Sequence, residues 1–132
     1  MKSTLCLTIA LAAMLLAPLT AQEKALPVLQ YVDGHGNSYE FLGDGDSYTL
    51  EFEPVKKGKY SGGEPATRRV SKDSFEKVSA RMEKAIKRKT TGTRERGTAL
   101  IIKSVKGDQK EYILPKNSSD IKEIEALLYA LF

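Results

Sequence analysis

The sequence predicts an α+β fold, an antiparallel sheet with elements in the order βββαββα and both helices packed on one of its faces. Segments that alternate apolar and polar residues come in groups joined by short turns, which is typical of antiparallel hairpins. Two segments with helical spacing of apolar residues stand between and after these groups. That order favours α+β over a parallel α/β arrangement. The chain contains no internal repeat, so a repeat architecture is not expected.

Three short strands are predicted first, at Val28 to Val32, Ser38 to Leu42 and Ser47 to Glu53. In the last two, every second residue is aromatic or aliphatic, as one buried face requires: Tyr39, Phe41, Tyr48, Leu50 and Phe52. The connections at 33–37 and 43–46 are rich in Gly, Asn and Asp, which accept the backbone conformations of tight turns. The three strands are therefore predicted to form a meander.

The segment from Val55 to Val70 is predicted to be the longest loop, because Pro54 ends the third strand. It contains Gly58, Ser61-Gly62-Gly63 and Pro65, a turn composition, and it has no apolar periodicity.

A helix is predicted to begin near Ser71 or Asp73, since Asp73 and Glu76 have the spacing of a capping box. Its apolar residues fall within about 100° of its surface, the width of a stripe that faces a core. They are Phe75, Val78, Met82, Ala85 and Ile86. Cations occupy another side of this helix, at Lys77, Arg81, Lys84 and Arg88.

A polar link from Lys89 to Gly97 leads to two more predicted strands, Thr98 to Val105 and Lys110 to Leu114, around a turn at 106–109. A final helix follows, with Asp120 and Glu123 as its predicted caps. Its apolar residues repeat with helical spacing: Ile121, Ile124, Leu127, Leu128 and Leu131.

Residues 1–21 have the pattern of an export signal. Lys2 supplies the positive charge, Leu5 to Leu16 form the apolar run, and Ala21 is a small residue at the cleavage position. We expect cleavage there, which leaves residues 22–132 as a single exported domain, periplasmic or secreted; an uncleaved anchor is the alternative. Cys6 is the only cysteine and lies within the signal. The exported domain is therefore expected to use neither disulfides nor thiolate chemistry.

Charge is unevenly distributed along the chain. Residues 22–55 hold one Lys and seven acids, a net −6, and residues 56–116 hold eighteen Lys or Arg and seven acids, a net +11. A basic middle predicts either an anionic partner or pairing with the acidic part of the same fold. The residues predicted to bind a partner are Lys56, Lys57, Lys59, Tyr60, Ser61, Gly62, Gly63, Arg68 and Arg69 in the loop, and Lys77, Arg81, Lys84 and Arg88 on the helix.

Motifs for catalysis or metal binding are incomplete. His35 is the single histidine and lies between two glycines, which a solvated turn explains better than base catalysis. Asp33, His35 and Asn37 have the spacing with which a calcium loop begins, but the segment 33–44 lacks the glycine and the final glutamate of such a loop. Ser74 and Lys77 match Ser-x-x-Lys, but helix capping explains Ser74 better. No metal and no cofactor is predicted, nor a phosphate loop in 58–63.

These observations predict an exported, non-enzymatic binding or structural domain. An inhibitor or ligand-binding module that uses the 55–70 loop is the alternative, and a small hydrolase that uses His35 is the third hypothesis. The predicted partner is an envelope or extracellular protein or an anionic polymer. No specific nucleic-acid binding and no membrane span after cleavage are expected, and the domain is predicted to be a monomer or to associate weakly.

Overall fold

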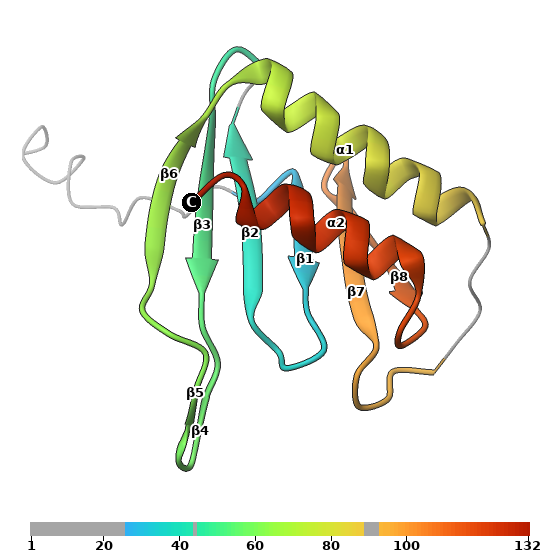
Figure 1. The fold of residues 1–132 in the computed structure, drawn as a ribbon. Helices are drawn as coiled ribbons and strands as arrows, with labels where there is room; N and C mark the ends of the chain where they lie inside the picture. Colours follow the sequence, from blue (N-terminus) through green and yellow to red (C-terminus); the bar gives the residue numbers. More distant parts are fainter. Residues whose placement is uncertain (1–25, 44, 89–92) are drawn as a thin grey trace, which may run out of the picture.

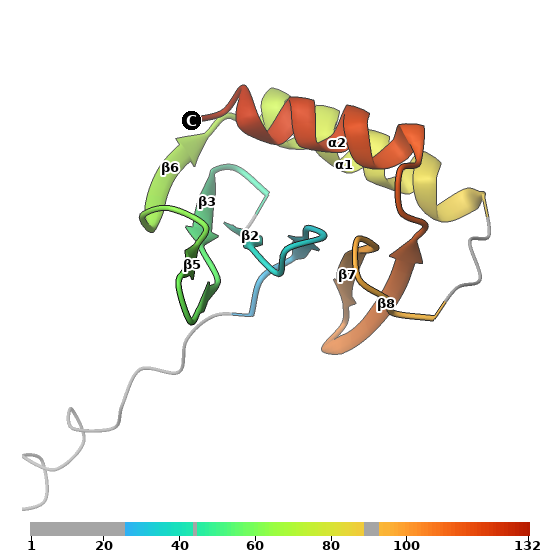
Figure 2. The same ribbon diagram turned by 60° about the horizontal axis from the view of Figure 1, so that its bottom comes forward.

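The computed structural model describes residues 26–43, 45–88 and 93–132. The predicted export signal at 1–21 and residues 89–92 of the polar link lie outside the described residues. The fold is a six-stranded antiparallel sheet in the order β6-β3-β2-β1-β7-β8, with two helices (Figure 1). Both helices lie side by side on the same face of the sheet (Figure 2). The predicted α+β class and the placement of the helices are therefore confirmed.

The first three strands form the predicted meander. They are β1 (Leu29–Val32), β2 (Ser38–Gly43) and β3 (Tyr48–Glu53). Leu29 lies opposite Phe41, which lies opposite Leu50, so that one row of buried apolar side chains crosses all three strands. Alternation with a period of two brings the same face of each strand to the core.

Residues 55–70 differ from the predicted loop. β4 (Lys56–Lys57) and β5 (Tyr60–Ser61) form a small hairpin, and β6 (Ala66–Val70) pairs with β3 at the edge of the sheet. Figure 1 shows the hairpin projecting beyond the end of the sheet. Apolar alternation could not find β6, because only Val70 in this strand is buried. Backbone pairing with β3, rather than side-chain burial, determines this strand.

Helix α1 (Lys72–Lys87) begins one residue after Ser71, whose Oγ accepts a hydrogen bond from the Ser74 N–H at 3.1 Å. Ser71 is therefore the N-cap, and the expected Asp73 capping box is wrong; Asp73 lies in the first turn, where its charge favours the positive end of the helix. Val78, Met82 and Ala85 are buried, as the predicted stripe requires.

Helix α2 (Ser119–Tyr129) is capped by Ser118, whose Oγ accepts from the Ile121 N–H at 3.3 Å. The predicted caps Asp120 and Glu123 instead reach towards α1. Asp120 is only 3% exposed. A carboxylate buried to this extent requires a partner, and that partner is Arg81.

The last two strands, β7 (Ala99–Val105) and β8 (Asp108–Leu114), form a hairpin around Lys106 and Gly107. Both residues have positive φ, 51° and 85°, which matches the twist of a two-residue hairpin turn. β7 also pairs with β1, and this joins the C-terminal hairpin to the meander.

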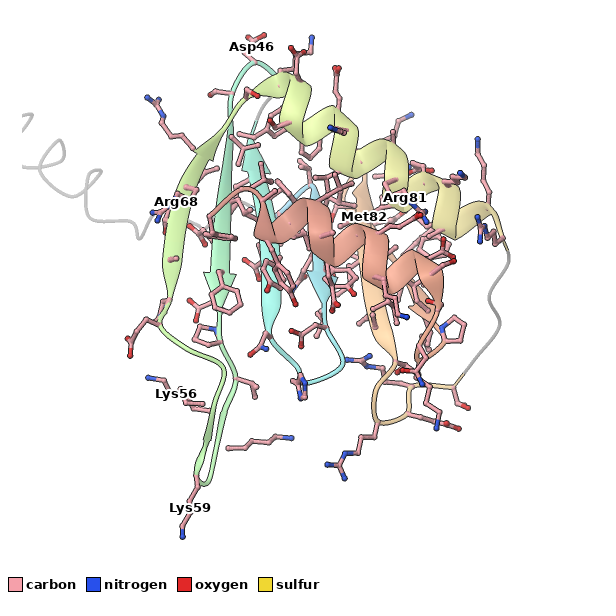
Figure 3. All side chains as sticks on the ribbon, viewed as in Figure 1. Asp46, Lys56, Lys59, Arg68, Arg81 and Met82 are labelled. Carbon is pink, nitrogen blue, oxygen red and sulfur yellow. The ribbon has the colours of Figure 1, made fainter. Side chains whose placement is uncertain are left out.

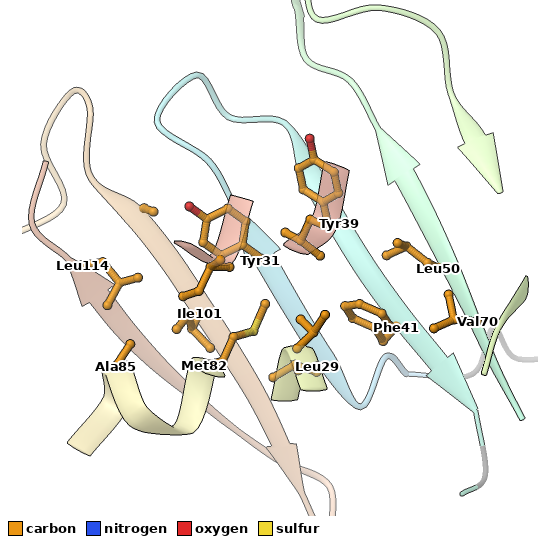
Figure 4. Packing of buried hydrophobic residues seen from close by; sticks show 14 residues of the cluster. Leu29, Tyr31, Tyr39, Phe41, Leu50, Val70, Met82, Ala85, Ile101 and Leu114 are labelled. Carbon is orange, nitrogen blue, oxygen red and sulfur yellow. The ribbon is translucent and has the colours of Figure 1, made fainter. Parts of the chain in front are cut away.

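The core lies between the sheet and the two helices. Figure 4 shows Met82 and Ala85 of α1 beside Leu29, Ile101 and Leu114 of the sheet. On the opposite face of the sheet, Gln30, Glu40, Glu51 and Thr67 form one polar cross-strand row. No described helix covers that face (Figure 2).

Candidate functional site

An open groove lies on the helix-bearing face of the sheet, between the end of α2 and strands β3 and β6. Its volume is about 330 Å³. We call it the aromatic groove, and its lining residues are Tyr39, Phe52, Glu64, Ala66, Arg68, Tyr129 and Phe132. This volume is within the range of small ligand-binding clefts.

The groove exists because α2 ends above the β3–β6 edge. The Leu131 N–H donates to the Leu128 carbonyl at 3.1 Å, and the Phe132 N–H donates to the Tyr129 carbonyl at 3.3 Å. These bonds continue the turn past the helix and bring Phe132 over the sheet. The Phe132 ring lies 6.0 Å from Phe52 and 6.2 Å from Tyr39, centroid to centroid.

The two rings contributed by the C-terminal segment remain accessible to solvent. Tyr129 is 55% exposed and Phe132 is 42% exposed, whereas Tyr39 beneath them is buried. The Arg68 guanidinium carbon lies 6.0 Å from the centroid of Phe132, at the limit of a cation–π contact. Exposed aromatic rings beside an arginine are the residue types that contribute most to protein interfaces.

The floor of the groove is uncharged. Burial raises the pKa of the Tyr39 phenol well above its ordinary value, and interactions with Tyr129, including a hydrogen bond, raise it further. The phenol therefore stays neutral through the physiological range. The groove offers apolar contact and hydrogen bonding at its floor, while its charge comes from Arg68 and Glu64 at its side.

The hairpin next to the groove is held at its base by Asn37, which is 6% exposed. Its side-chain oxygen accepts from the Val55 N–H at 2.9 Å, and the Gly62 N–H donates to the Val55 carbonyl at 3.1 Å. A Cβ on Gly62 would lie 2.0 Å from that Asn37 oxygen. Gly62, which we predicted as a contact residue, is therefore required for close backbone approach within the fold.

The predicted cations of this segment lie on different sides of it. Lys56, Lys57 and Lys59 are exposed on the hairpin, and Figure 3 shows Lys59 at its tip. Along β6 the side chains alternate, so that Arg68 faces the aromatic groove and Arg69 faces the opposite side of the sheet. Ser61, at the end of β5, exchanges two hydrogen bonds with Gly63 in the exposed segment that follows. The expected anchoring role of the Tyr60 side chain lies outside what the structure describes.

The predicted cationic stripe of α1 is not uniform. Lys77 and Lys84 are exposed, but the side chain of Arg81 is only 12% exposed. One Arg81 nitrogen donates to Asp120 at 2.8 Å, and the guanidinium also pairs with Glu123. Figure 3 shows Arg81 between the two helices. Arg88 approaches Asp120 at 3.6 Å. Two of the four predicted contact residues therefore join α1 to α2.

The two residues considered for catalysis, His35 and Ser74, lie in a turn and at a helix start. His35 is exposed on the turn after β1, and its backbone N–H donates to the Asp33 carboxylate at 2.9 Å. The Ser71 hydroxyl lies 3.0 Å from that of Ser74, which places Ser74 in the helix cap. The described part of the chain contains no group of three or more His, Cys, Asp or Glu residues that could hold a metal ion.

The aromatic groove was not predicted from the sequence. Phe52 and Tyr39 were assigned to a strand face that is wholly buried, and Tyr129 and Phe132 were not assigned a role. A signal was nevertheless present at Tyr129, which falls outside the predicted apolar stripe of the last helix. Large apolar residues off the core-facing stripe are candidates for an exposed interaction surface.

Comparison of the chain with protein-family models, with curated proteins and with solved structures finds no match. Among the described residues, neither helix is long and apolar enough to cross a membrane. Function is therefore inferred from the groove, the strand edge beside it and the charges that surround both.

Proposed function

We propose that this chain is an exported, non-enzymatic binding domain whose aromatic groove and β6 edge take an extended, acidic segment of a partner protein. One observation carries this proposal: exposed aromatic rings lie directly beside a strand whose outer edge has no partner among the described strands. The residues lining the groove include no hydroxyl or thiol nucleophile other than tyrosine and no histidine. Binding is therefore favoured over hydrolysis at this position.

The strand edge supports an extended partner. β6 pairs with β3 on one side, and no described strand pairs with its other side, where a partner strand could add to the sheet. In strand addition, backbone hydrogen bonds supply affinity and pockets for alternate side chains supply specificity. A partner strand beside β6 would direct every second side chain towards the face that holds Arg68 and the aromatic groove.

The local charge supports an acidic partner. Residues 55–70 hold five Lys or Arg and one Glu, a net +4. The same charge opposes pairing of β6 with β6 of a second copy, because Arg68 and Arg69 would meet like charges. The surface thus favours a partner of opposite charge over self-association, which agrees with the expectation of a monomer.

Binding is tested with protein recovered outside the cytoplasm and a fluorescein-labelled peptide of alternating Glu and Val with a central Phe. Fluorescence anisotropy should give saturable binding, and a peptide with Lys in place of Glu should bind much more weakly. Phe132→Ala and Arg68→Glu should each weaken binding about tenfold or more, since truncating a central aromatic or reversing a contacting charge costs at least about 1.4 kcal/mol.

Lys84→Glu is the matched control, because Lys84 is exposed on α1 and does not line the groove. Equal loss in Lys84→Glu and Arg68→Glu would contradict a local site, and an unchanged affinity in Phe132→Ala would contradict the groove. Inhibitory hairpin insertion, the alternative, would instead depend on Lys59 at the hairpin tip. Export is tested separately by mass spectrometry of the same preparation, which should show an N-terminus near Gln22.

A further inference from the structure

A second recess lies at the end of the sheet where the β1–β2 turn meets the hairpin and the segment before β7. It consists of two adjoining cavities of about 430 Å³ each, which share Gly34, His35 and Arg96. We call these the cationic lobe, which includes Lys57, and the carboxylate lobe, which includes Glu125. Residues far apart in the chain thus meet around one histidine.

The cationic lobe is lined by Gly34, His35, Lys57 and Arg96, with no carboxylate among them. Neither Lys57 nor Arg96 has an ion-pair partner within the described part of the chain. Gathering positive side chains around one cavity is electrostatically unfavourable without a counter-charge. Nothing in the packing of the core requires Lys57 and Arg96 to converge, since both are exposed, Lys57 on β4 and Arg96 in the segment before β7.

The walls of this recess are fixed by a buried polar network. Asp33, only 4% exposed, accepts hydrogen bonds at 2.9 Å from the His35 N–H, the Asn37 N–H and the Asn37 side-chain amide. Arg94 donates to Thr98 Oγ1 at 3.0 Å and to the Asp33 carbonyl at 3.4 Å. These bonds tie the β1–β2 turn to the segment before β7, so that the recess has a preformed shape.

Close backbone contact reinforces this arrangement. A Cβ on Gly34 would lie 3.1 Å from the Gly97 Cα, and Gly97 itself has a φ of 88°, which favours glycine. The two backbone segments therefore approach each other more closely than bulkier residues would allow. Arg96, next to Gly97, is carried to the cavity by this contact.

The carboxylate lobe limits what the recess can hold. Glu125 is half-buried and accepts a hydrogen bond from the Tyr31 hydroxyl at 3.2 Å. Lys122 and Arg96 line the same lobe, and Asp33 adds a second carboxylate to it, so two cations accompany two carboxylates. An anion would be attracted to the Lys57 and Arg96 side and repelled from the Glu125 side, whereas hydrogen-bond donors of a ligand would suit Glu125.

We infer that the recess binds a small ligand through an oxyanion, a phosphate, sulfate or carboxylate group, held between Lys57 and Arg96 beside His35. Arginine offers a planar pair of donors for such a group, and lysine adds a point charge. The cationic lobe shares no lining residue with the aromatic groove, whereas Tyr129 lines both that groove and the carboxylate lobe.

The test uses the protein recovered outside the cytoplasm, labelled with ¹⁵N, and titrations with inorganic phosphate, sulfate and acetate. Amide signals of Gly34, His35 and Gly97 should shift in a saturable way with at least one of these anions, and the comparison identifies the preferred oxyanion. Lys57→Gln and Arg96→Gln should each raise the dissociation constant about tenfold, as expected when a charge-assisted contact is lost.

Lys59→Gln is the control, because Lys59 belongs to the same hairpin but does not line the recess. Its dissociation constant should match that of the unchanged protein. Equal weakening in Lys59→Gln, Lys57→Gln and Arg96→Gln would show diffuse attraction to a basic surface and overturn the site. Linear, unsaturable shifts with all three anions would overturn it as well. Far-ultraviolet circular dichroism of each variant separates lost binding from lost folding.

Discussion

Glu125 occupies a position that disfavours its charged form. Burial raises the pKa of this carboxyl above its ordinary value of 4.5, and the neighbouring charge of Asp33 raises it further, while the Tyr31 hydrogen bond and His35 oppose the shift. The net direction is upward. A group whose pKa is raised on folding holds its proton more tightly in the native state than in the unfolded chain.

The free energy of unfolding should therefore fall as the pH rises from about 4.5 through the raised pKa of Glu125 in the folded state. Glu125→Gln should abolish this part of the pH dependence, because the amide does not titrate. At neutral pH this variant should be more stable than the unchanged protein, because it places no charge at this position and its amide can still accept the Tyr31 hydrogen bond. Urea titrations at a series of acidic and neutral pH values measure the free energy of unfolding of each protein. Glu111→Gln on exposed β8 serves as the control and should leave the slope unchanged; a Glu125→Gln curve parallel to that of the unchanged protein would contradict the assignment.

Arg81 shows at the same scale what a sequence pattern can and cannot establish. Helical spacing correctly places it off the apolar stripe, on the side with Lys77, Lys84 and Arg88. The pattern could not show that this side faces α2. Asp120 and Glu123 lie 39 and 42 positions later in the chain, and only the packing of the two helices brings them to Arg81. A cation that appears solvent-facing in sequence is thus partly buried in an ion pair.

Between the elements, the pair of Arg81 and Asp120 fastens α1 to α2. Their side chains are 12% and 5% exposed, so each single truncation leaves the other charge poorly solvated. In a double-mutant cycle of Arg81→Ala and Asp120→Ala, the double variant should lose less free energy of unfolding than the two single variants lose together. The difference should be about 1–3 kcal/mol. Chemical denaturation supplies the four free energies.

The pair of Lys103 and Glu83, which joins β7 to α1, offers a matched comparison. Its side chains are 38% and 35% exposed, so solvent screens the interaction and the coupling energy should stay below about 1 kcal/mol. Equal coupling energies for the two pairs would show that burial does not determine the strength of these ion pairs.

Elements with buried alternating or helical patterns were predicted from the sequence to within about two residues at most of their ends. The departures have a common physical cause. β6 carries Thr67, Arg68 and Arg69 and depends on backbone pairing with β3, which leaves no hydrophobic pattern. The aromatic groove depends on where α2 ends relative to the sheet. The recess at His35 depends on the meeting of the β1–β2 turn, the hairpin and the segment before β7. Patterns within a segment encode burial, whereas these sites are set by contacts between segments.

At the scale of the whole molecule, the described residues form one core, because both helices share one face of one sheet. Leu128 of α2 is completely buried, so Leu128→Ala should lower the free energy of unfolding by about 2–5 kcal/mol. Lys84→Ala on the exposed side of α1 should change it by no more than about 0.5 kcal/mol. Thermal unfolding followed by circular dichroism and by tyrosine fluorescence should give coincident transitions in both variants; separate transitions for helix and tyrosine signals would contradict a single core.

The position of β1 inside the sheet sets an order of events for folding. β1 pairs with β2 through a short turn, but Leu29 finds Lys103 of β7 only across α1 and the basic middle of the chain. Closing so long a loop costs more chain entropy than closing a hairpin, so the β1–β7 seam forms after the local pairs. Until then, β1 and β7 each have one unpaired edge, although both strands lie inside the finished sheet. A chain that emerges N-terminus first keeps its first strand half-paired until β7 has appeared, and this interval is when it is most exposed to aggregation.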